Sequence, residues 1–128
     1  MGIKDIEEVI IGACSNLGIV TISDIYVPDD FPQGVSKRIV IHVKQQQRGD
    51  YFYKGFVEVN VVVPDIDGRE DHKTLQDAET ALVSAFKYDT CGSFGDDTFR
   101  YGLNSIQILK DENYHYVNAR LLFEILNI

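Results

Sequence analysis

Two segments of the chain alternate between apolar and other side chains with a period of two, and this pattern limits the possible folds most strongly. It covers residues 56–63 and residues 115–126. Successive side chains of a β-strand point to opposite faces of a sheet, so the period predicts half-buried antiparallel strands. The predicted inner faces comprise Val57, Val59, Val61 and Val63 in the first segment, and His115, Val117, Ala119, Leu121, Phe123 and Ile125 in the second.

A third alternating segment, residues 37–44, predicts a hairpin with residues 56–63. The linker between them contains a Gly49-Asp50 turn signal followed by three consecutive aromatic residues. We therefore expect a long β-hairpin whose tip projects beyond the sheet.

Shorter or weaker signals fill the rest of the predicted sheet. Residues 19–26 are rich in β-branched side chains, and residues 105–109 form a short apolar segment. Both predict strands, with a bulge at Gly102 before the second. Residues 88–97 are Gly-rich and acidic and predict a loop.

Two amphipathic helices are predicted, at residues 3–17 and 71–88. Both have apolar side chains at helical spacing, and either Asp71 or Thr74 can cap the second helix. The element order is then α-β-β-β-α-β-β. We predict one α+β domain over residues 1–128, a single antiparallel-rich sheet with both helices packed on one face.

The charge of the chain disfavours nucleic acid as a partner. Among 128 residues, 20 acidic side chains face 12 basic ones, a formal net charge of −8. Residues 1–64 carry −2 and residues 65–128 carry −6. Proteins that hold nucleic acid through its phosphates need clustered Lys and Arg, and anionic membranes repel an acidic surface. We expect neither partner, nor a membrane span or a signal peptide, and therefore an intracellular protein.

No residue pattern in the chain predicts an enzyme or a bound cofactor. Cys14 lies on the apolar face of the first predicted helix, and Cys91 lies in the predicted loop. The strongest catalytic candidate is the acidic segment of residues 65–72, since clustered carboxylates can bind a hard cation. Its spacing does not fit a calcium-binding EF-hand loop, so a solvated turn before a helix is favoured over a metal-dependent hydrolase. We predict no catalytic residue and no metal ligand.

The last predicted strand and the hairpin tip hold the candidate interaction residues. Aromatic and Arg side chains are enriched in protein interfaces. The three tip aromatics either project as an anchor or fold back against the core. The last strand, if it lies at the edge of the sheet, also offers a site for pairing with a neighbour. The candidate interface residues are Tyr51, Phe52, Tyr53, Tyr116, Arg120 and Leu122.

The arrangement resembles the tail-terminator and tail-completion (head–tail joining) proteins of tailed phages and prophages. The similarity lies in size, element order and acidic character. It extends from the helix at residues 3–17 through the hairpin of residues 38–63 and the helix at residues 71–88 to the closing hairpin of residues 105–125.

The resemblance implies a non-enzymatic virion structural protein. Such proteins form an oligomeric ring, commonly hexameric, that caps the tail tube and joins it to the head connector. The implied partners are other copies of the chain, the tail-tube protein and the connector, first in the bacterial host cytoplasm and then in the virion. An acidic lumen suits a ring through which DNA slides. The alternative is a small cytosolic adaptor module with one protein client.

Overall fold

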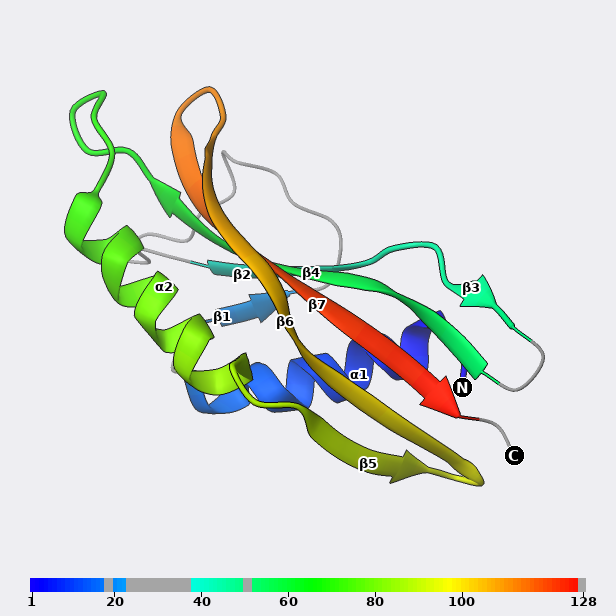
Figure 1. Cartoon of the computed structure of the whole chain (residues 1–128). Coiled ribbons are helices and arrows are strands. Elements are labelled where there is room, and N and C mark those ends of the chain that lie inside the picture. The colour runs from blue at the N-terminus through cyan, green and yellow to red at the C-terminus, as the bar shows by residue number, and fades with distance from the viewer. Residues whose placement is uncertain (18–19, 23–37, 50–51, 127–128) are drawn as a thin grey trace.

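The computed structural model describes residues 1–17, 20–22, 38–49 and 52–126. Within these residues two α-helices accompany one mixed, mainly antiparallel sheet (Figure 1). Helix α1 is followed by a short 3₁₀ turn, Ser15–Leu17. The elements are α1 (Ile3–Cys14), β1 (Val20–Ile22), β2 (Arg38–Val43), β3 (Gln47–Arg48), β4 (Phe52–Pro64), α2 (His72–Phe86), β5 (Thr90–Phe94), β6 (Asp97–Lys110) and β7 (Tyr114–Leu126).

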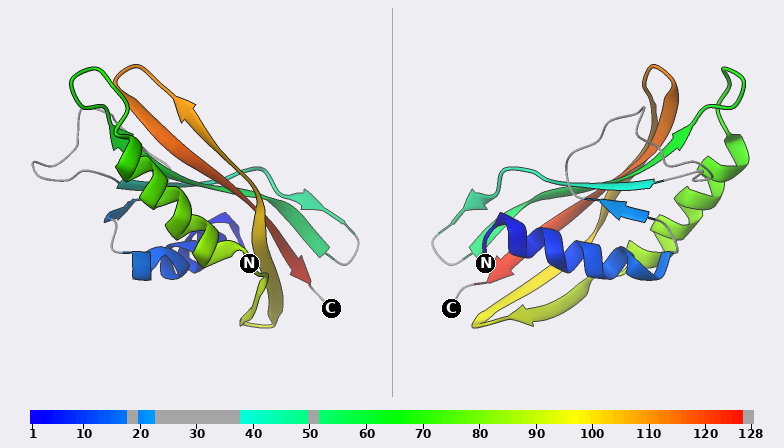
Figure 2. Two further views of the ribbon diagram at one scale, coloured as in Figure 1. Left: turned by 60° about the vertical axis from the view of Figure 1, so that its left-hand side comes forward. Right: turned by 180° about the vertical axis from the view of Figure 1, so that it is seen from behind.

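The spatial order of the strands is β1-β2-β4-β7-β6-β5, with β3 paired to the start of β4. All neighbours are antiparallel except β1 and β2, which run parallel. Both helices lie on the same face of the sheet (Figure 2), so the predicted α+β architecture is confirmed.

The buried core lies between this face and the helices. Its helical part is formed by Ile6, Ile10 and Cys14 of α1 and by Leu75, Ala78, Leu82 and Phe86 of α2. These positions recur at helical spacing, which is why each helix buries one stripe. The predicted inner faces of β4 and β7 are buried as well, except for His115, which is half-buried. Each fully buried Leu, Ile or Phe side chain stabilises the fold by about 1.5–3 kcal/mol.

The second helix begins where the sequence predicted. Asp67 and Gly68 both have positive φ angles, of 51° and 77°, in a two-residue turn that pairs Ile66 with Arg69. This geometry favours Asp-Gly in type I′ turns. Two residues later Asp71 caps α2, its carboxylate accepting hydrogen bonds from the Thr74 backbone N–H and hydroxyl. The turn and cap thus reverse the chain from β4 into α2.

Three features of the sheet differ from what the sequence predicted. Residues 88–97 contain strand β5 and not only a loop. The predicted short strand at residues 105–109 is part of the 14-residue β6, whose register shifts between Leu103 and Ser105. The last strand, β7, is not at an edge, because β4 and β6 pair with its two sides.

The hairpin before β4 also differs from the prediction. Strand β4 pairs with β7 along its whole length, from Phe52–Leu126 to Pro64–Tyr114, so its aromatic start does not project beyond the sheet. Strands β3 and β7 pair with the two sides of β4 at this end, and their backbone hydrogen bonds hold it in place. Of the predicted strand at residues 19–26, residues 20–22 form β1; the remaining positions lie outside the described residues.

Candidate functional site

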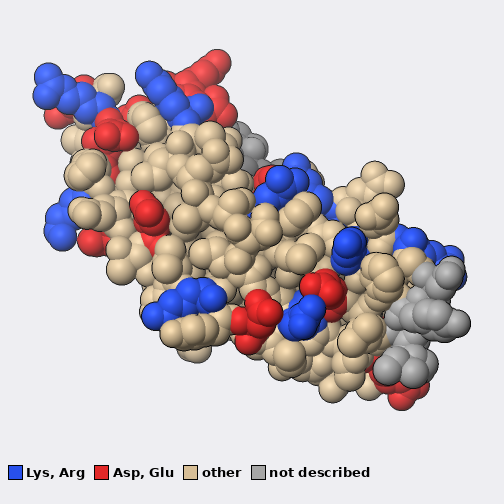
Figure 3. All heavy atoms as spheres, in the orientation of Figure 1, with Lys and Arg blue, Asp and Glu red and all other residues tan. Residues whose placement is uncertain are grey.

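The sheet has a second face, turned away from both helices, which we call the helix-free face. Strand alternation places on it every second residue of β2, β4, β7 and β6, and the register aligns these residues in rows across the sheet. These rows are Val40-Asn60-Asn118-Gln107, His42-Glu58-Arg120-Ser105 and Phe56-Leu122-Gly102. Acidic and basic side chains are scattered among uncharged ones over the side of the molecule seen in Figure 3.

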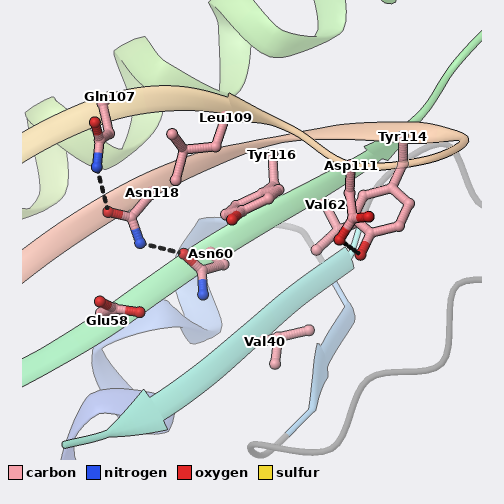
Figure 4. Close-up of a pocket in the computed structure, with 10 residues that line it drawn as sticks. All are labelled: Val40, Glu58, Asn60, Val62, Gln107, Leu109, Asp111, Tyr114, Tyr116 and Asn118. Carbon is pink, nitrogen blue, oxygen red and sulfur yellow. Dashed lines mark hydrogen bonds between the residues drawn. The ribbon is translucent and has the colours of Figure 1, made fainter.

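The first row is a chain of hydrogen-bonded amides. The Gln107 Nε2 group donates to Asn118 Oδ1 at 3.5 Å, and Asn118 Nδ2 donates to Asn60 Oδ1 at 2.6 Å (Figure 4). Asn118 is only 5% exposed, so its amide is satisfied within the sheet. The outer amides each keep hydrogen-bonding capacity beyond these two bonds. The row can therefore present both donors and acceptors to a bound partner.

Beside the amide row the sheet is hollowed. The cavity has a volume of about 300 Å³ and is lined by Val40, Glu58, Asn60, Val62, Gln107, Leu109, Asp111, Tyr114, Tyr116 and Asn118 (Figure 4). Its apolar wall is the cluster of Val40, Val62 and Tyr114, against which Tyr116 packs. The hollow combines an apolar wall with polar groups, as binding pockets do.

Two carboxylates, those of Asp111 and Glu58, interact with the tyrosines of this hollow. The Tyr114 hydroxyl donates to Asp111 Oδ2 at 2.6 Å, and this bond, with a second from the Glu112 backbone N–H, holds the pKa of Asp111 below its usual value. Burial, followed by the charges of Asp111 and Glu58, raises the pKa of Tyr116. Tyr116 is therefore a neutral phenol at physiological pH and offers its hydroxyl as a donor.

Next to the hollow, Arg120 stacks on Phe56. The guanidinium carbon lies 4.0 Å from the centre of the ring, a close cation–π contact. Within the described part of the chain the buried Arg120 Nε has no hydrogen-bond acceptor. Leu122 follows on the same face, opposite Phe56 in register. An Arg held over an aromatic ring beside a leucine is the type of group that dominates binding energy in protein interfaces.

The structure brings together three of the six predicted interface residues. Tyr116, Arg120 and Leu122 lie along the helix-free face of β7, as the alternation predicted. Phe52 is 40% exposed at the start of β4, where it pairs with Leu126 at the far end of the same face. Tyr53 has the opposite orientation and packs against the core, and Tyr51 lies outside the described residues.

The predicted interface residues did not include Phe56, Asn60 and Asn118, which also belong to this surface. The alternation of β4 placed Phe56 and Asn60 on its outer face. Only the pairing of β4 with β7, however, sets Phe56 beside Arg120 and Asn60 beside Asn118. Strand register across different hairpins has no local sequence signal, so the contacts themselves could not be predicted.

The acidic segment of residues 65–72 serves the fold. Asp65 Oδ1 lies 2.7 Å from His115 Nδ1, and both side chains are largely buried. Glu70 Oε2 lies 3.9 Å from the other ring nitrogen of His115, and Asp71 caps α2. Three carboxylates of the segment, those of Asp65, Glu70 and Asp71, thus have partners within the fold. Among the described residues no group of three or more His, Cys, Asp or Glu side chains is arranged to hold a metal ion.

Neither a known protein family nor a curated protein matches this chain. In the described part of the chain, no helix has the length and apolar character needed to cross a membrane.

Proposed function

We propose that this chain is a non-enzymatic structural subunit that binds protein partners through its helix-free face. The observation that carries the proposal is the Phe56–Arg120–Leu122 group beside the hollow, on a sheet face that no described helix covers. Interface anchors combine aromatic, Arg and apolar side chains in this way, with polar groups around them.

We further propose that the subunit belongs to a phage or prophage virion. It would form an oligomeric ring that caps the tail tube and joins it to the head connector. The element order and acidic character that carry the resemblance to tail-terminator proteins support this assignment. The net charge of −8 suits a lumen that lets DNA pass without gripping its phosphates.

In such a ring, the start of β4 and strand β7 would act as one contact patch. Phe52 pairs with Leu126, and Phe56 with Leu122, so the hairpin and β7 contribute to one continuous surface. A ring with head-to-tail contacts needs two different patches on each subunit. These two elements together supply one patch, and the second lies elsewhere on the subunit.

A cytosolic adaptor with one client is the second candidate. The hollow of about 300 Å³ favours it, since a pocket of this size can receive a few side chains of one client. The two candidates differ in assembly: a ring repeats identical contacts, whereas an adaptor binds its client without forming a ring.

The test begins with the reading frames that flank the gene. The tagged chain is co-expressed with their products and purified, and the complexes are imaged by electron microscopy. We expect rings, and co-purification of a tail-tube or connector protein. Arg120→Glu should abolish the association, because it reverses the charge at the centre of the surface. Thr80→Arg, on the exposed side of α2, is the matched control. Flanking metabolic or signalling genes, with no ring, would contradict the virion assignment and favour the adaptor.

A further inference from the structure

Strand β5 forms an edge of the sheet that lacks the usual protection against pairing. Among the described strands it pairs only with β6, in unbroken register from Thr90–Tyr101 to Phe94–Asp97. Its sequence, Thr-Cys-Gly-Ser-Phe, has no charge and no proline, and four of its five residues are exposed. Proteins that stay monomeric blunt such edges with charges, prolines or bulges. This edge is therefore suited to receive another strand.

The hairpin geometry shows which backbone groups are available. A two-residue loop, Gly95-Asp96, joins β5 to β6, with a φ angle of 60° at Gly95. In such a hairpin the residues that flank the loop, here Phe94 and Asp97, form a hydrogen-bonded pair, and these pairs alternate along the ladder. The N–H and C=O groups of Cys91 and Ser93 consequently point away from β6, toward the open edge.

We infer that a second copy of this chain pairs its β5 antiparallel to this edge, about a two-fold axis at Cys91. Tyr88 and Phe94 stand three residues before and after Cys91 and are 75% and 38% exposed. Antiparallel pairing centred on Cys91, when continued two residues past the start of β5 at Thr90, sets Tyr88 of each copy opposite Phe94 of the other. Four exposed rings then pair across one short contact, and cross-strand aromatic pairs stabilise sheets.

The charges along the edge fit pairing between two acidic copies. In this register Thr90 faces Gly92, Cys91 faces its own counterpart, and Asp89 faces the uncharged Ser93. No like charges oppose each other over this stretch, although each copy carries −8. The contact closes at two copies and leaves the helix-free face uninvolved, so it stands or falls independently of the proposed function.

The register is tested by reversing one charge. Sedimentation equilibrium of the full chain gives the dimer dissociation constant for the wild type, Ser93→Lys and Ser93→Asp. Lys at position 93 faces Asp89 of the other copy and should tighten the dimer, and Asp should weaken it. Two such pairs per dimer predict changes of about 2- to 30-fold in opposite directions. A monomer at every concentration, or a shift in the same direction for both variants, would overturn the inference.

A second measurement tests the edge itself. A short bismaleimide should cross-link the wild-type dimer through Cys91, because the other cysteine, Cys14, is buried. The variant Cys91→Ser should lose the cross-link and keep the dimer.

Ser93→Pro should abolish the dimer without unfolding the chain, since proline is tolerated where the N–H points away from the ladder. A folded Ser93→Pro variant that still dimerises would show that β5 is not the contact.

Discussion

At the scale of single residues, burial separates the two cysteines. Cys14 is fully buried on α1, and this burial raises the pKa of its thiol to about 12. A group with a raised pKa stabilises the fold below its unfolded pKa, near 9, and loses this contribution as the pH rises. We expect the free energy of unfolding to fall above about pH 9 by up to about 1.4 kcal/mol per pH unit on account of Cys14.

The measurement compares urea unfolding of the wild type and Cys14→Ala between pH 8 and pH 10.5 or so. The variant is less stable overall, but its stability should decline less steeply above pH 9, because no buried thiol remains to ionise. Cys91→Ala is the matched control and should leave the wild-type slope unchanged, since Cys91 is exposed. Equal slopes for all three proteins would contradict the assignment.

The contact between Asp65 and His115 joins the turn before α2 to the start of β7. At 2.7 Å and largely buried, it should contribute to stability, and its loss leaves a buried carboxylate without its partner. His115→Ala should therefore lower the free energy of unfolding by about 1–3 kcal/mol. His72→Ala, whose side chain is 81% exposed, should change it little. Denaturant unfolding of both variants at one pH tests this, and a similar cost for the two would be contrary to expectation.

This contact could not be predicted from the sequence. The acidic turn and His115 were both noted, but they are 50 residues apart, and only the fold sets them side by side. The helix cap at Asp71 was within reach, because capping depends on residues three positions apart. Local chemistry could be predicted at this scale, and long-range pairs could not.

At the scale of elements, Gly92 holds the β5–β6 hairpin against the core. A Cβ atom at this position would lie 2.5 Å from the Phe99 ring, which occupies the space above the glycine. Phe99 in turn stacks on Phe123, with ring centroids 5.5 Å apart. Gly92→Ala should displace Phe99 and cost about 1–3 kcal/mol of stability.

Thermal unfolding checks this expectation, with Ser93→Ala on the same strand as the control. The double variant Gly92→Ala, Phe99→Leu distinguishes the cause. If the ring clash is responsible, the glycine substitution should cost less when Phe99 is already shortened, since neighbouring sites do not add independently. Strictly additive losses would locate the effect in the backbone and not in the ring.

Whether an element could be predicted from the sequence depended on the strength of its local pattern. β4 and β7 alternate over many residues, and α1 and α2 keep a helical stripe, so all four could be predicted. The short β5 combines a central glycine with small polar residues and has no alternation to recognise. The central place of β7 had no local sign either, because it depends on pairing with β4 and β6.

At the scale of the whole molecule, the two sides of the sheet differ, because the helices cover one side and no described helix covers the other. The helices cover the inner face (Figure 2). The helix-free face gathers Tyr116, Arg120 and Leu122 from β7 with Phe56 from β4. Two of these residues form a stacked pair whose Arg Nε has no acceptor among the described residues. The proposed function therefore requires that this surface is an assembly contact.

The proposed virion role is tested most directly by electron microscopy of virus particles produced with Leu122→Arg in place of the wild-type chain. Arg at this position introduces an unpaired charge into the apolar part of the surface, while circular dichroism should show an intact fold. If the chain joins heads to tails as proposed, heads and tails should remain separate with Leu122→Arg and should be joined with the control Thr80→Arg. Joined particles at the wild-type frequency with a folded Leu122→Arg chain would contradict it.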